Sequence, residues 1–237
     1  MSLTWKWGLA LSLALITAAC GKKQEAPQTA ETEATAAASA AAAPDAQPAA
    51  PAPAPAAPAA SNAVVDERAA AIQAALAEDA IVSDSRGQFA VSAIASSTYS
   101  ADKKPESRVS YTPNAATGAP DVERYGDNGD AWTPETPDKG IEWLEVTFAK
   151  PVNATQIRIR QNFCPGAIIK IELIADDGSR HTVWQGVDDR QYPQSTITWF
   201  DRSFEKTAYK VTGARITLAT NAVSGWNEID AVQLLGD

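Results

Sequence analysis

The chain has 237 residues, and its 29 acidic and 20 basic side chains give a net charge of −9. This length allows one or two globular domains. The acidic excess is spread along the chain, which argues against nucleic acid as a partner, because binding nucleic acid depends on lysine and arginine side chains that neutralise phosphates. An acidic surface also fits poorly with docking on anionic lipid.

Residues 1–19 have the pattern of a secretion signal. Lys6 supplies an early positive charge, an apolar run extends from Gly8 to Ile16, and small residues follow it. The run is too short to cross a bilayer core as a permanent helix, so the pattern predicts a signal peptide. The alternative is a short buried helix.

Cys20 directly follows this segment. The stretch Leu15-Ile16-Thr17-Ala18-Ala19-Cys20 resembles a bacterial lipobox, although Thr17 stands where Leu is usual. The resemblance implies cleavage before Cys20 and acylation of that residue, and anchoring by more than one acyl chain is stable. Gly21, by the same resemblance, favours sorting to the outer membrane. We therefore expect a lipid-anchored protein of the cell envelope, facing the periplasm or the cell surface.

Residues 20–62 are predicted to form a disordered tether. Between Gln24 and Asn62 the chain contains no aromatic or aliphatic side chain larger than Ala, so it cannot bury enough surface to offset the entropy of ordering. Ala-Pro repeats favour an extended spacer, and the alternative is a partly helical stretch around residues 36–43.

Residues 63–87 lead into the folded part of the chain. Val65, Ala69, Ile72 and Leu76 recur at spacings near four residues, which predicts a short amphipathic helix over residues 64–80. This helix either packs on the following domain or stays frayed.

Residues 88–237 show the period-two alternation of strands. The pattern is clear in Leu144, Val146 and Phe148, and Asp176 to Ser179 reads as a hairpin turn. About eight short strands are predicted, opening near Phe89 and then covering residues 141–149, 154–160, 167–175, 181–184, 196–200, 209–218 and 226–235. This spacing predicts an all-β, antiparallel jelly-roll β-sandwich rather than a parallel sheet.

Four motifs of this region, in order, resemble one known superfamily. They are Ala95-Ser96-Ser97-Thr98-Tyr99, Ala115 to Asp121, Glu142 to Phe148, and Trp226-Asn227-Glu228-Ile229-Asp230. The set resembles galactose-binding-like domains, which include discoidin or coagulation factor 5/8 type C domains and family 32 carbohydrate-binding modules. The region is also similar to the glycan-binding domain of some NAD glycohydrolases. The resemblance implies a jelly roll that binds carbohydrate.

Catalytic chemistry has little support in the sequence. His181 is the only histidine, and it lies in a predicted strand with no motif around it. Cys164 has no second cysteine to pair with once Cys20 is acylated, and a lone thiol of this kind is usually a small packed side chain. A pair of catalytic carboxylates stays open in so acidic a chain. We expect a binding protein rather than an enzyme.

Acidic side chains gather between Gly118 and Asp138, and hard cations prefer six to eight oxygen ligands. The resembled family holds a structural calcium ion with this loop and a Glu of the last strand, which implies Asp121 and Glu228 as ligands here. Local candidates to join them are Asp127 and Asp130. The alternative is a solvated acidic loop, since Ala131 stands where the family has a hydroxyl ligand.

Sugar recognition needs an exposed aromatic face with polar side chains beside it. Such pairs fall at predicted loops and strand ends, namely Arg124-Tyr125, Asn162-Phe163, Asp201-Arg202 and Trp226-Asn227. Trp132, Trp143 and Trp199 are instead assigned to the core or to sheet packing. Two functions stay open. The loops bind a glycan such as peptidoglycan or surface polysaccharide, or they bind another envelope protein in a structural or adaptor role.

Overall fold

The computed structural model describes residues 59–104 and 106–237. In this part of the chain one helix, α1 (Ala59–Val82), precedes eight strands and two short 3-10 helices. The strands are β1 (Gly87–Ala95), β2 (Ile141–Val152), β3 (Ala154–Phe163), β4 (Ile168–Ala175), β5 (Arg180–Gln185), β6 (Thr198–Ser203), β7 (Val211–Ala219) and β8 (Glu228–Gly236). The 3-10 helices are η1 (Pro113–Ala116) and η2 (Thr220–Ala222). The all-β prediction with about eight strands is confirmed. The predicted signal peptide, Cys20 and the tether up to residue 58 lie outside the described residues.

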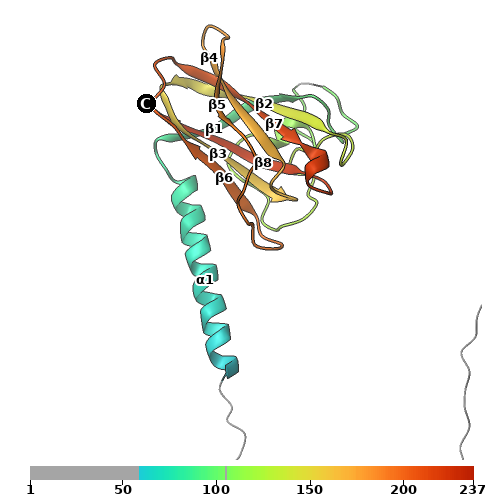
Figure 1. The fold of residues 1–237 in the computed structure, drawn as a ribbon, viewed down its shortest axis with the longest axis vertical. Helices are drawn as coiled ribbons and strands as arrows, with labels where there is room; N and C mark the ends of the chain where they lie inside the picture. The colour runs from blue at the N-terminus through green and yellow to red at the C-terminus, as the bar shows by residue number, and fades with distance from the viewer. Residues whose placement is uncertain (1–58, 105) are drawn as a thin grey trace, which may run out of the picture. The chain divides into compact units, whose positions relative to one another are not determined.

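All eight strands pair antiparallel, in the order β5-β4-β7-β2-β1-β8-β3-β6 (Figure 1). β1 joins the two halves of the sandwich, because Gly87–Phe89 pair with β8 and Ala90–Ala95 pair with β2. The two edge strands meet on the other side, where Trp184 of β5 packs edge-on against Phe200 of β6 with ring centroids 4.9 Å apart. The result is a nearly closed antiparallel sandwich.

The core follows from the alternation seen in the sequence. Leu144, Val146 and Phe148 of β2 are buried, as are Ile157 and Ile159 of β3, because successive strand residues point to opposite faces. Each such side chain, once buried, stabilises the fold by about 1.5–3 kcal/mol.

β8 differs from the other strands because both of its faces are covered. Its polar residues Glu228, Asp230 and Gln233 are at most 1 % exposed. Buried polar groups need hydrogen-bond partners. These partners come from β3, from the acidic loop and from the end of α1, so β8 is where the parts of the domain are joined.

The helix α1 begins at Ala59, inside the segment predicted to lack structure. Its apolar side chains Val64, Val65, Ile72 and Leu76 are 52–60 % exposed, so the predicted apolar face does not pack on the sandwich. Among the described residues, no helix is long and apolar enough to cross a membrane.

The described contacts between α1 and the sandwich come from the last turns of the helix. Glu78 forms an ion pair with Arg160 of β3 at 2.9 Å and accepts a hydrogen bond from Trp199 Nε1 of β6 at 2.6 Å. The Gln233 side chain of β8 donates to the carbonyl of Ile81 at 3.0 Å. These polar contacts fix the end of the helix to β3, β6 and β8.

Candidate functional site

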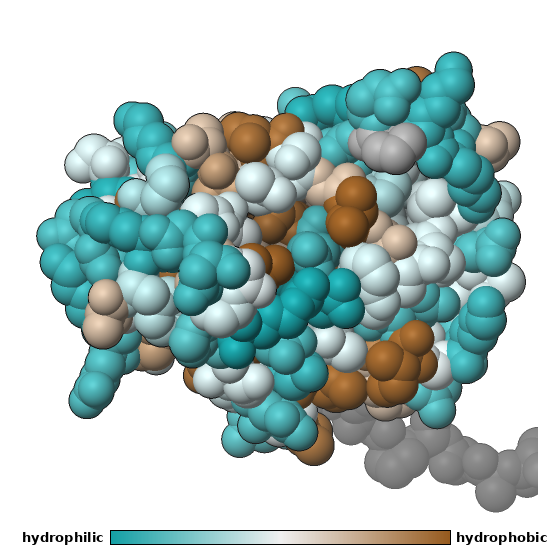
Figure 2. Space-filling model, turned by 90° about the horizontal axis from the view of Figure 1, so that it is seen from above, coloured by the Kyte–Doolittle hydropathy of each residue, from teal (hydrophilic) through white to brown (hydrophobic). Residues whose placement is uncertain are grey.

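Four loops meet at one end of the sandwich, and we call this end the rim. They are residues 96–140, 164–167, 186–197 and 220–227, and they join β1 to β2, β3 to β4, β5 to β6 and β7 to β8. The pairing of Ala95 with Leu144, of Phe163 with Glu228 and of Ile168 with Leu218 brings these strand ends together. In the face shown by Figure 2, hydrophilic residues cover most of the surface and hydrophobic ones form small separate patches.

Three aromatic rings converge on the rim from separate parts of the chain. The ring of Tyr99 lies edge-on to Tyr111 at 5.1 Å and to Trp226 at 5.0 Å between centroids. Tyr99 is 55 % exposed, and the other two rings are half-buried. We call Tyr99, Tyr111 and Trp226 the aromatic cluster.

A cavity of about 490 Å³ adjoins the aromatic cluster. It is lined by Tyr99, Ser100, Ala101, Asp102, Val109, Ser110 and Tyr111. Apolar rings, hydroxyl groups and a carboxylate therefore face one space. Ligand sites commonly combine an apolar surface with a few placed polar groups in this way.

Trp132 holds this part of the rim in place. Its indole is fully buried, its Nε1 donates to the carbonyl of Ser97 at 3.1 Å, and its backbone exchanges two hydrogen bonds with Ile229 of β8, at 2.9 and 3.0 Å. The backbone of Tyr111 bridges to Trp132 on the other side. The assignment of Trp132 to the core is confirmed, and the same residue sets the position of the aromatic cluster.

Strained backbone is concentrated on the rim. Among the described residues, four other than glycine have positive φ, namely Tyr111 (64°), Asp138 (55°), Cys164 (43°) and Ser195 (53°), and all four lie in the rim loops. Each such conformation costs on the order of 1–3 kcal/mol and persists only where the surroundings enforce it. Strain of this kind collects at binding sites, which supports the rim as the functional end.

A buried carboxyl group is connected to the aromatic cluster through Asp127. Glu228 is 1 % exposed and accepts hydrogen bonds from the Asn128 N–H at 3.1 Å and from the side chain of Asn162. Burial raises the pKa of Glu228 to about 8, and the neighbouring carboxylate of Asp127 adds to the rise. Asp127 in turn accepts a hydrogen bond from Tyr111 Oη at 2.9 Å. The aromatic cluster is thereby linked to the start of β8.

The four predicted calcium ligands do not come together as one set. Asp121 is paired with Arg108 at 3.0 Å, and with Asp130 it lines a small cavity of about 50 Å³. Asp127 and Glu228 are neighbours at a separate point. Within the described residues, no three acidic, His or Cys side chains are placed to hold a metal ion together.

A guanidinium group takes part in holding the acidic loop to β8. Arg160 Nη1 donates to the carbonyl of Val122 at 2.7 Å and is paired with the carboxylate of Asp230. Burial raises the pKa of Asp230 to about 6, although Arg160 opposes this rise. The same Arg160 binds Glu78 of α1, so one side chain connects the helix, the strand and the loop.

The predicted ligand-binding pairs occupy different environments. Tyr125 and Phe163 form a second pair of contacting rings, with centroids 5.4 Å apart, and both are half-buried. Arg124, next to Tyr125 in the chain, is exposed. Asn162 and Asn227 are buried. The side-chain amide of Asn162 donates to the carbonyl of Gly126 at 3.1 Å, and that of Asn227 donates to the carbonyl of Cys164 at 2.7 Å. Trp226 belongs to the aromatic cluster.

Asp201 and Arg202 lie within β6 and not in a rim loop, which corrects their predicted position. β6 runs to Ser203, beyond the end expected from the sequence. Arg202 lies 3.8 Å from the ring of Phe200 and 4.6 Å from that of Trp184, and Asp201 binds Arg190 at 2.9 Å. These residues close the gap between the two edge strands.

The two candidates for covalent chemistry are far from forming a pair. His181 stacks on Tyr209 at 3.9 Å near the end opposite the rim. Cys164 lies on the rim, and burial raises the pKa of its thiol, which keeps it protonated near neutral pH. Within the described residues the two side chains do not meet.

Comparison with protein families gives one match. The family model described as pappalysin-1, SD scarf domain, C-terminal, matches residues 80–237, which is most of the chain. The chain belongs to the SD scarf domain family. The match begins near the end of α1 and includes every strand and every rim loop of this SD scarf domain. No curated protein matches the chain.

Several solved structures are similar to this SD scarf domain at low identity. Chitosan-binding module 1 of a chitosanase/glucanase from Paenibacillus sp. IK-5 is 14 % identical with a TM-score of 0.44, over 61 % of this chain and 93 % of the module. An F5/8 type C domain from Bacteroides fragilis is 14 % identical with a TM-score of 0.45, over 65 % and 98 %. The family 32 module of C. perfringens NanJ, solved with galactose, is 16 % identical with a TM-score of 0.41, over 62 % and 98 %. These structures thus include an F5/8 type C domain and a family 32 module, two kinds of domain that the sequence resembles.

The buried carboxyl group of Glu228 predicts how stability depends on pH. Its folded-state pKa of about 8 lies above the ordinary value of 4.5, so at pH 6–8 the unfolded chain has released a proton that the folded chain keeps. Stability therefore falls as pH rises through this window, by at most about 1.4 kcal/mol per pH unit from this group. The raised pKa of Asp230 makes stability fall with rising pH in the same way, mainly below pH 6.

Glu228→Gln should accordingly be more stable than the wild type at pH 8 in the presence of EDTA, and this advantage should shrink as the pH is lowered to 6. The amide keeps an oxygen that accepts from Asn128 and Asn162 and removes the buried charge. Urea unfolding at both pH values measures the difference. A variant that loses stability equally at both would show that the carboxylate itself is required.

Proposed function

We propose that the rim is a carbohydrate-binding surface centred on the aromatic cluster. The observation that carries the proposal is the convergence of Tyr99, Tyr111 and Trp226, with Tyr99 more than half exposed beside a cavity of about 490 Å³. The C–H faces of a sugar ring are apolar and pack on aromatic faces, while its hydroxyl groups need polar partners. The cluster offers both kinds of contact.

The polar groups around the cavity suit hydroxyl recognition. Ser100, Asp102 and Ser110 line it, and the Tyr111 hydroxyl points to Asp127. Carboxylates accept hydrogen bonds only, and hydroxyl groups both donate and accept, so together they can satisfy the donors and acceptors of a sugar. The edge-on contact with Tyr99 and the hydrogen bond to Asp127 fix the ring of Tyr111 before a ligand arrives, which lowers the entropy cost of binding.

Tyr99→Ala and Trp226→Ala should each weaken glycan binding by about tenfold or more, since a lost aromatic contact of about 1.4 kcal/mol corresponds to that factor. The full chain is screened on a glycan array and on insoluble peptidoglycan, and titration calorimetry measures the affinity of the best ligand. Trp143→Ala is the matched control, because it removes an indole that packs under Arg215 on an outer sheet face.

Melting temperatures of the variants show whether the fold is intact. Unchanged affinity in both rim variants would remove the aromatic cluster from the site. Absence of any glycan signal, together with a crosslinked envelope protein that Tyr99→Ala releases, would favour the adaptor function at the same surface.

We further propose that a calcium ion binds next to Glu228. Oε1 of Glu228 and Oδ1 of Asn162 are buried and receive no hydrogen bond from the described residues. With the adjacent carboxylate of Asp127, they form a set of oxygens that a hard cation prefers. Glu228, Asp127 and Asn162 would hold the ion, which would replace the missing donors and tie the loop to β8. Asp121 and Asp130 are not part of this proposal, because Arg108 already supplies a cation beside Asp121.

Adding millimolar Ca²⁺ to the EDTA-treated chain should raise its melting temperature by about 5 °C or more, because an ion that binds only the folded state stabilises it by mass action. Glu228→Gln and Asp127→Asn should lose this increase. Asp130→Asn, an acidic residue of the same loop, should keep it. A wild-type melting temperature that ignores Ca²⁺ contradicts the proposal.

Finally, we propose that the mature protein is anchored to the outer membrane by acyl chains on Cys20. The support is the sequence pattern alone: a signal-like segment, Cys20 in a lipobox-like position and Gly21 after it. A glycan-binding rim on a tethered domain would then act close to the cell envelope.

A clickable fatty-acid probe should label the wild-type chain in bacterial cells, and Cys20→Ser should abolish the label. Cys164→Ser is the control and should label normally, because Cys164 lies in the folded domain. Labelling that survives Cys20→Ser would place the acyl group elsewhere or reject the anchor.

A further inference from the structure

The rim has a second cavity, which shares no residue with the aromatic cluster. Its volume is about 380 Å³, and all four rim loops contribute to it. Its apolar walls are Tyr125, Pro165, Tyr192, Pro193 and Val223. Exposed polar side chains complete it, namely Gln194, Ser195 and Ser224. The second cavity therefore combines aromatic rings with hydroxyl and amide groups, as ligand sites commonly do.

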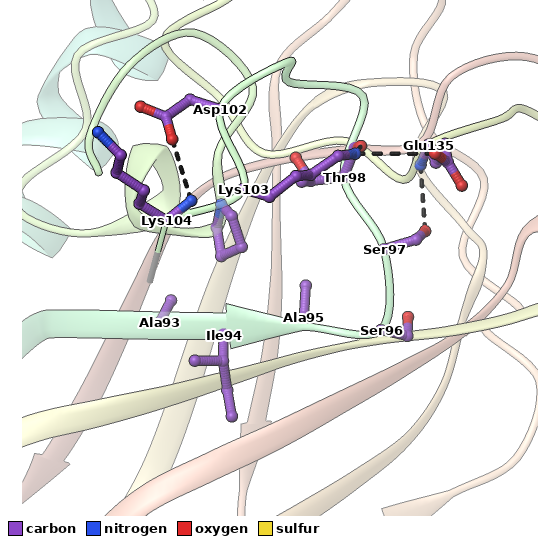
Figure 3. Close-up of a pocket in the computed structure, with 11 residues that line it drawn as sticks. Ala93, Ile94, Ala95, Ser96, Ser97, Thr98, Asp102, Lys103, Lys104 and Glu135 are labelled. Atoms are coloured by element: carbon purple, nitrogen blue, oxygen red, sulfur yellow. Dashed lines mark hydrogen bonds and ion pairs between the residues drawn. The ribbon is translucent and has the colours of Figure 1, made fainter. Parts of the chain in front are cut away.

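The second cavity is uncharged, although the chain has a net charge of −9. None of the described residues that line it is acidic or basic. The cavities of about 490 and 50 Å³ both include carboxylates. The cavity of about 350 Å³ beside β1 is bordered by Asp102, Lys103, Lys104 and Glu135 (Figure 3). The second cavity thus suits an uncharged ligand, because a charged group placed there would lose hydration without gaining a partner.

Hydrogen bonds and backbone strain show that the walls of the second cavity are fixed in advance. The Tyr192 hydroxyl donates to Asp188, whose side chain is buried. Asn227 donates to the carbonyl of Cys164 at 2.7 Å. Cys164 and Ser195, which both line the cavity, have φ angles of 43° and 53°. Such conformations persist only where the surroundings enforce them, and a preformed site binds with a smaller loss of entropy.

Two segments of the chain contribute to both the second cavity and the aromatic cluster. In the loop before β8, Ser224 lines the cavity and Trp226 belongs to the cluster, so their Cα atoms are at most about 7 Å apart. In the acidic loop, Tyr125 lines the cavity, and Asp127 accepts the hydrogen bond of Tyr111 in the cluster. The two sites are therefore neighbours on one surface, close enough for one ligand to occupy both.

We propose that the second cavity is a second sugar subsite, and that the rim binds an uncharged glycan chain across both sites rather than a single terminal sugar. This inference rests on the proposed carbohydrate-binding function of the aromatic cluster. Once one sugar unit is held at the cluster, the next unit meets the cavity as part of the same molecule, so its contacts strengthen binding without a second loss of overall motion. The ligand class is a neutral oligosaccharide or polysaccharide.

Oligomers of glucose, galactose and N-acetylglucosamine, of one to six units, test the proposal on the full chain. Titration calorimetry measures their affinity, with NMR titration where binding is weak. Tyr125→Ala removes a ring from the second cavity. Ser224→Arg places a long charged side chain at an exposed position of its wall. Asn221→Arg is the matched control, because Asn221 is an exposed residue of the same loop that does not line the cavity.

At least one neutral series should gain about tenfold or more in affinity between one unit and four, as expected for an added aromatic contact within one molecule. Ser224→Arg and Tyr125→Ala should each remove most of this gain, and Asn221→Arg should keep it. Ser224→Arg should leave the affinity for a single unit unchanged, whereas Tyr99→Ala should weaken the binding of single units and chains alike. Oligomers of galacturonic acid should show no gain with length.

A neutral series that shows no rise with length, or a rise that Ser224→Arg leaves intact, overturns the second subsite and leaves the proposed function of the aromatic cluster standing. Ser224→Arg decides the case if Tyr125→Ala melts at a lower temperature, because Ser224 is exposed. Failure of every oligomer to bind overturns both proposals.

Discussion

The segment between β1 and β2 contains almost no regular structure, and its attachment to β8 through Trp132 decides where the rim side chains lie. The Trp132 backbone pairs with Ile229, its indole fills the core, and its Nε1 donates to Ser97. A long loop without such a support would not keep a residue such as Tyr111 at positive φ. The strained rim is possible because the core beneath it is rigid.

The same dependence on β8 explains the polar residues at its start. Glu228 and Asp230 are buried, which costs free energy unless loop groups compensate. Asn162, Asn128 and Arg160 supply that compensation in large part, yet an oxygen of Glu228 remains without a donor. A fold that needed only stability would place apolar residues here. These polar residues instead orient the acidic loop, and through Asp127 they reach the aromatic cluster.

The strands were predictable because alternation reports local burial, and all eight occur near the expected positions. The limits of prediction from alternation show in β6, where the strand continues three residues past the expected end and takes Asp201 and Arg202 out of the loops. No local signal marks this, because the residues are held by rings of β5 and by Arg190. Tyr99 ends the motif Ala95 to Tyr99, yet nothing in the sequence places its ring beside Trp226, and Tyr111 stands in no motif at all.

The metal ligands illustrate the same limit more sharply. Asp121 and Asp130 lie close in sequence to Asp127, and the acidic composition of the loop groups all three. In the structure Arg108 binds Asp121, 13 positions away, and Arg160 binds Asp230, 70 positions away. Sequence spacing within one loop cannot foresee such partners. The rim geometry leaves Asp127 and Glu228 as the pair to test.

Trp132 supports the rim, and native-state hydrogen exchange of Trp132→Phe measures this support directly. Phenylalanine keeps most of the buried ring and removes the bond to Ser97. The amides of Tyr99 and Tyr111, which bond to other rim residues, and of Gly126, which bonds to Asn162 at the end of β3, should lose protection. Those of Ile159 and Val232 in the sandwich should keep theirs. Rim amides that stay protected, or rim and sandwich amides that lose protection together, would contradict the account.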